Sequence, residues 1–63
     1  FNINYNMQYR YFSSTDKKKE TVGVVTSDTL EEAYISASKI KNLSLDTFKK
    51  LFTVEKMTRM FHS

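Results

Sequence analysis

Apolar and polar residues alternate without a break from residue 2 to residue 11. The apolar positions are Ile3, Tyr5, Met7, Tyr9 and Tyr11, and the polar positions between them are Asn2, Asn4, Asn6, Gln8 and Arg10. A period of two residues is typical of a strand with one buried face, and tyrosine and isoleucine favour strands. Phe12 falls on the polar side, so we expect the strand to end or bulge there.

The first six residues raise a separate question, because Met7 could be an original start of the chain. In that case residues 1–6 would not be native. The alternation runs through Met7 unbroken, so we favour a native strand that includes these residues.

Residues 13–19 contain no apolar side chain, which predicts a hairpin loop. A second strand is predicted over residues 21–26, which are rich in valine. Gly23 is the only glycine of the chain, and within a strand it indicates a bulge or a close backbone approach.

A helix is predicted to begin after Thr29, because a threonine followed three residues later by Glu32 has capping-box spacing. Its apolar stripe comprises Leu30, Ala33, Tyr34, Ala37 and Ile40 or Lys41. Asn42 suits the left-handed position that ends a helix.

A shorter helix, residues 45–51, is predicted to follow a cap at Ser44. Its apolar side comprises Leu45, Phe48 and Leu51 or Phe52. Apolar alternation and β-branched residues then return, which predicts a third strand over residues 53–57, extending as far as Met60 in the longest version. A continued helix over residues 52–60 is the alternative, because the apolar residues there also have helical spacing.

These elements predict one small α+β domain over residues 1–63, in the order β-β-α-α-β. The simplest arrangement is a three-stranded antiparallel sheet with both helices packed on one face. The tyrosine-bearing face of the first strand is then expected to pack on the first helix, and the face with Arg10 to meet water.

Composition excludes several kinds of site. The chain has no cysteine and one histidine, His62, so we expect no disulfide and no metal site. No nucleophile, base and orienting residue occur together, and one glycine cannot build a phosphate loop. We therefore predict a protein that is not an enzyme and has no cofactor.

The same composition bears on location. No apolar run approaches the ~20 residues that cross a bilayer, which predicts no membrane partner. The absence of cysteine and of a signal-peptide pattern favours a cytoplasmic location.

Positive charge suggests one possible function. The formal net charge is +3, and the loop run Lys17-Lys18-Lys19 is its most visible feature. Such a run is common at solubilising loop tips, but it can also contact phosphates. A weak, salt-sensitive nucleic-acid site would use Arg10, Lys17, Lys18, Lys19, Lys49, Lys50 and Arg59, with Phe12 for base stacking.

An interaction with protein is the favoured function, because the net charge is modest and the core of such a short chain is small. We predict a small protein-binding module or inhibitor that acts through an exposed sheet face or an edge strand, with a homodimer as one form. The first strand, long and poor in charge, is the expected edge. Met57, Met60 and Phe61 form either an adaptable contact surface or part of the core. A structural piece of a larger assembly is a third possibility.

Overall fold

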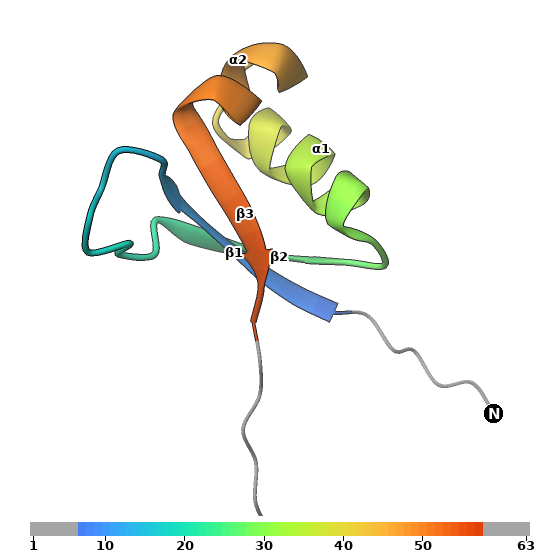
Figure 1. Cartoon of the computed structure of the whole chain (residues 1–63). Helices are drawn as coiled ribbons and strands as arrows, with labels where there is room; N and C mark the ends of the chain where they lie inside the picture. Colours follow the sequence, from blue (N-terminus) through green and yellow to red (C-terminus); the bar gives the residue numbers. More distant parts are fainter. Residues whose placement is uncertain (1–6, 58–63) are drawn as a thin grey trace, which may run out of the picture.

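The computed structural model describes residues 7–57, which form one sheet and two helices (Figure 1). The elements are β1 (Met7–Ser13), β2 (Gly23–Ser27), α1 (Leu30–Ile40), α2 (Leu45–Leu51) and β3 (Phe52–Lys56). The predicted α+β class and the β-β-α-α-β order are confirmed. The predictions for residues 1–6 and for Arg59, Met60 and Phe61 lie outside the described residues.

The sheet is antiparallel throughout, and its strand order is β2-β1-β3. Tyr9 lies opposite Val25 of β2 and opposite Lys56 of β3. β1 is therefore the central strand, and our expectation that it forms an edge is wrong. Alternation along a strand shows which of its faces is buried, but it does not show which strands lie on either side.

The aromatic content of β1 suits a central position. Tyr9 and Tyr11 are buried beneath the helices, and Phe12 is buried on the opposite side of the sheet. The expected break at Phe12 is absent, because β1 continues to Ser13 and pairs with β3 as far as Phe52.

Gly23 shows the close approach that its position predicts. The ring of Tyr11 lies over it, and a Cβ atom added at Gly23 would stand 2.6 Å from the ring Cζ. The backbone is also irregular here, because the N–H of Val22 donates to the Tyr11 carbonyl although Gly23 is the partner of Tyr11. Glycine is needed at this point because any side chain would displace the tyrosine.

Both helices begin at the predicted caps. The Thr29 side chain accepts the N–H of Glu32 at 3.1 Å, and the Ser44 side chain accepts the N–H of Thr47 at 3.2 Å. α1 is followed by Asn42 in the left-handed region, with φ of 62°. The caps satisfy backbone N–H groups that have no partner inside the helix.

The buried stripe of α1 is narrower than predicted. Ala33 and Ala37 are completely buried, whereas Leu30 and Ile40 are exposed. The two small alanines let the helix lie close to the sheet. The larger side chains at the margins of the stripe, Leu30 and Ile40, therefore lie outside the helix–sheet contact. Ser38 is also buried, because its hydroxyl donates to the Ile35 carbonyl and so needs no water.

α2 closes the core with Phe48, which is completely buried. The Phe48 ring stacks on Phe52 at 4.8 Å between centroids and meets the edge of Tyr11 at 5.6 Å. Leu51 is exposed, so Phe52 is the residue that completes the apolar side. The segment Phe52–Lys56 is a strand, which excludes the alternative of a continued helix there.

Candidate functional site

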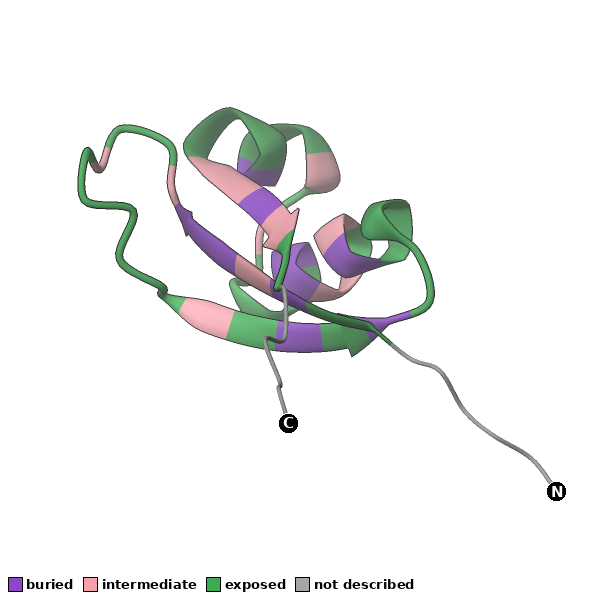
Figure 2. Ribbon diagram, turned by 60° about the horizontal axis from the view of Figure 1, so that its bottom comes forward, coloured by how far each residue is buried: buried purple, intermediate pink, exposed green. Residues whose placement is uncertain are grey.

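The helices cover one face of the sheet, and the opposite face carries no helix (Figure 2). We call this opposite side the open face. From the strand register, it carries the side chains of Gln8, Arg10, Phe12, Val24, Thr26, Thr53 and Glu55. Burial on this face is uneven, since Val24 and Thr26 of β2 are exposed whereas Phe12 of β1 is buried.

Arg10 ties three segments together on the open face. Its Nε and Nη2 donate to Glu55 Oε2 on β3, at 2.9 and 2.5 Å. Its Nη1 donates to the Lys19 carbonyl at 2.9 Å and to the Thr21 hydroxyl at 3.0 Å, and so holds the β1–β2 loop against the sheet. The guanidinium also lies 4.8 Å from the centroid of the Phe12 ring. These contacts explain why Phe12 is buried on a face without a helix, and they leave it no open ring surface for base stacking.

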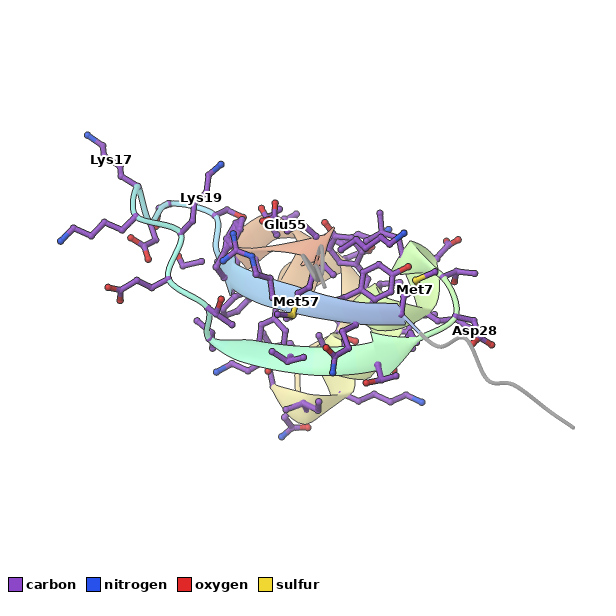
Figure 3. All side chains as sticks on the ribbon, turned by 90° about the horizontal axis from the view of Figure 1, so that it is seen from below. Met7, Lys17, Lys19, Asp28, Glu55 and Met57 are labelled. Carbon is purple, nitrogen blue, oxygen red and sulfur yellow. The ribbon has the colours of Figure 1, made fainter. Side chains whose placement is uncertain are left out.

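The lysine loop is shaped by Asp16. One carboxylate oxygen accepts the N–H of Lys18 and the other accepts the N–H of Glu20, both at 3.0 Å. Lys19 has a positive φ of 53°, and its N–H donates to the Asp16 carbonyl. The loop is therefore an ordered turn held by hydrogen bonds to Asp16. Lys17 and Lys19 project from it into solvent at one end of the molecule (Figure 3).

The base of the lysine loop is joined to the end of α2. The N–H of Ser14 donates to the Leu51 carbonyl at 2.9 Å, and Lys50 precedes Leu51 in the helix. Lys49 is directed elsewhere, with its Nζ 5.5 Å from the ring centroid of Tyr34 on α1. Arg59 lies outside the described residues. The predicted basic residues are therefore not gathered on one surface. Lys17–Lys19 lie in the loop, Arg10 is bonded to Glu55 and to the Lys19 carbonyl, and Lys49 packs on Tyr34.

Acidic side chains gather at the opposite end of β2. Asp28 follows the strand directly, and Glu31 and Glu32 lie in the first turn of α1. A shallow open depression of about 330 Å³ lies between this end of β2 and α1, and its lining includes both Asp28 and Glu32. β2 therefore runs from a lysine-bearing loop to an acidic turn, and Figure 3 shows Lys17 and Asp28 at opposite ends of the sheet.

The two edges of the sheet differ. Even-numbered residues of β1 bond to β3, as shown by Met57 N–H donating to Gln8 and Ser14 N–H donating to Leu51. In an antiparallel ladder, the odd-numbered residues then bond to β2, and the alternate residues of each edge strand point their backbone groups outward. On β3 the outward N–H of Val54 donates to the Tyr34 hydroxyl at 3.3 Å, so a side chain of α1 occupies that edge at its middle residue.

On β2 the outward groups belong to Val24 and Thr26. Among residues 7–57, no side chain or loop is hydrogen-bonded to these groups. Val24 is 46% exposed and Val22, just before the strand, is 50% exposed. We call Val22–Thr26, with its outward backbone groups, the β2 edge. It combines unpaired backbone groups with exposed valines. Sequence alternation does not indicate which strand lies at the edge of a sheet, so this site could not be predicted.

Other kinds of site find no support in the part of the chain that the structure describes. No three metal-ligating side chains come together there. No helix within residues 7–57 has the length and apolar character needed to cross a bilayer.

Comparison of the chain with known protein families, with curated proteins and with solved structures gives no match.

Proposed function

We propose that this protein is a small protein-binding module or inhibitor that adds its β2 edge to a strand of another chain. The observation that carries the proposal is the difference between the two edges of the sheet. The outward N–H of Val54 on β3 is bonded to the Tyr34 side chain of α1, whereas no outward N–H of β2 has a partner among the described residues. An unpaired edge with exposed valines is a template for strand addition.

The residues of β2 strengthen this proposal. Natural proteins commonly protect an exposed edge with charged residues or proline, or with a covering loop. The strand Gly23–Ser27 has no charged residue and no proline. Main-chain hydrogen bonds would provide affinity, and the exposed side chains of Val24 and Thr26 would provide selectivity.

The proposal is tested by capture of binding proteins from nuclease-treated lysate of the source cells. Thr26→Pro removes an outward N–H, and Val24→Lys places a charge beside the edge. We expect both variants to lose proteins that the unchanged chain captures, while Leu51→Lys, an exposed substitution on α2, retains them. Equal capture by all four proteins would contradict the proposal, provided that circular dichroism shows each variant to be folded.

Nucleic-acid binding is the second candidate, and the projection of Lys17 and Lys19 into solvent at one end of the molecule is the observation that favours it (Figure 3). Phosphate contacts release counterions, so binding would fall steeply as salt rises. We expect the affinity for a single-stranded oligonucleotide to decrease strongly between ~50 and ~200 mM salt. The variant Lys17→Glu/Lys18→Glu should lose this binding. Absence of binding at low salt would remove this candidate.

A further inference from the structure

We infer that the strand that pairs with the β2 edge is the β2 edge of a second copy, in an antiparallel arrangement about a two-fold axis. This inference rests on the proposed function, and it names the partner. An isologous contact of this kind uses the same surface on both chains, so a single complementary surface is sufficient.

The backbone defines the pairing. Val24 and Thr26 are the two residues of β2 whose N–H and C=O groups point outward. In an antiparallel pair each bonded residue faces its partner and exchanges two hydrogen bonds. Placing Val24 opposite Thr26 of the second copy therefore satisfies both residues on both chains. The two-fold axis then passes beside Val25.

Charge selects this orientation. The lysine loop lies before β2, whereas Asp28, Glu31 and Glu32 follow it. In the antiparallel pair, the Lys17–Lys19 loop of each copy lies beside the acidic turn of the other. A parallel pair would place lysines beside lysines and carboxylates beside carboxylates, which is unfavourable.

The open face gains an apolar contact from the same arrangement. Val24 of each copy lies directly opposite Thr26 of the other on one face, so the valine contacts the threonine methyl group. The two sheets join into six strands, with the helices of both copies on one side. Because β2 has only five residues, the interface is small, and we expect a weak dimer whose population depends on concentration.

Sedimentation equilibrium across a range of protein concentrations tests the inference. Lys17→Glu/Lys18→Glu reverses charge at the basic end of β2, and Asp28→Lys/Glu32→Lys reverses it at the acidic end. We expect each double variant alone to dimerise at least about tenfold more weakly than the unchanged chain, because like charges then face each other. An equimolar mixture of the two variants should recover dimers at low salt.

The matched control for the first variant is Lys49→Glu/Lys56→Glu, which changes the net charge equally on α2 and β3, away from the lysine loop. This control should dimerise as the unchanged chain does. Unchanged dimerisation in the two β2-end variants, or no recovery in their mixture, would overturn the antiparallel pairing. A chain that stays monomeric at millimolar concentration would also overturn it. If the chain stays monomeric, the lysate capture experiment decides the proposed function separately. Loss of a captured protein in Thr26→Pro would then support the proposed function without the homodimer, whereas equal capture by Thr26→Pro and the unchanged chain would overturn both the homodimer and the proposed function.

Discussion

The hydroxyl of Tyr34 on α1 accepts the backbone N–H of Val54 on β3 at 3.3 Å. This contact joins residues twenty positions apart and occupies the outer edge of the sheet at one position of β3. The same ring meets Phe48 edge-on, so its position is fixed from the core. Because no helix side chain among residues 7–57 is hydrogen-bonded to the outward backbone of β2, the two edges of one small sheet differ in their capacity to pair.

Tyr34→Phe isolates the contribution of that hydroxyl. The ring remains against Phe48, but the N–H of Val54 loses its acceptor, so we expect about 1 kcal/mol of lost stability. Amide hydrogen exchange measured by NMR should show faster exchange at Val54. The amide of Val25, which lies within the β1–β2 ladder, serves as the internal control and should change only as global stability changes. Unchanged exchange at Val54 would show that the contact is not formed in solution.

Arg10 is expected to matter more for stability than its ion-pair partner. Removing Glu55 costs an ion pair that is partly open to solvent, about 0.5–1 kcal/mol. Removing Arg10 also exposes Phe12 and releases the loop from the sheet, because the Lys19 carbonyl loses its donor. Urea unfolding should therefore show a larger loss for Arg10→Ala than for Glu55→Ala, and the double variant should lose less than the sum of the two. Equal losses would mean that Arg10 acts only as the partner of Glu55.

Phe48 is the side chain on which the core depends most. Phe48→Ala is expected to cost about 3–5 kcal/mol, because it leaves a cavity among Tyr11, Tyr34 and Phe52. A chain of this length has a total stability of roughly 3–9 kcal/mol, so the variant should be partly or wholly unfolded at 25 °C. Leu51→Ala, on the same helix but 51% exposed, should unfold close to the unchanged protein. Circular dichroism during thermal unfolding distinguishes these outcomes.

Gly23→Ala should destabilise the sheet although alanine is a small residue. The added Cβ would overlap the Tyr11 ring, and relieving such a clash typically costs about 1–3 kcal/mol. If the ring is the cause, the effect of Gly23→Ala should be much smaller in a Tyr11→Leu background, which a double-mutant cycle measures. An equal loss in both backgrounds would indicate that the irregular backbone beside Val22 is the cause instead.

The sequence was most informative where a local rule applied. Thr29 and Ser44 are local caps, and both lie where the hydroxyl-bearing residue predicts a helix start. Gly23 was informative for a similar reason, because its missing side chain indicates a close approach even when the approaching group is unknown. The burial of Tyr9 and Tyr11 followed from alternation alone.

Features that depend on distant residues could not be predicted in this way. Phe12 occupies a polar position of the alternation, and it is buried because Arg10, held by Glu55 across the sheet, covers it. The central place of β1 depends on β3, which pairs with it after two helices. For the same reason the edge at β2 was missed, since an edge is defined by the neighbours that a strand lacks.

The central claim is that β2 is the edge that pairs, and concentration-dependent amide exchange of the unchanged chain tests it most directly. As protein concentration rises, the amides of Val24 and Thr26 should gain protection together. Val25, already bonded to β1, should respond far less. Rising protection at the outer edge of β3, or unchanged exchange at Val24 and Thr26 in a sample that sedimentation shows to be dimeric, would contradict the claim.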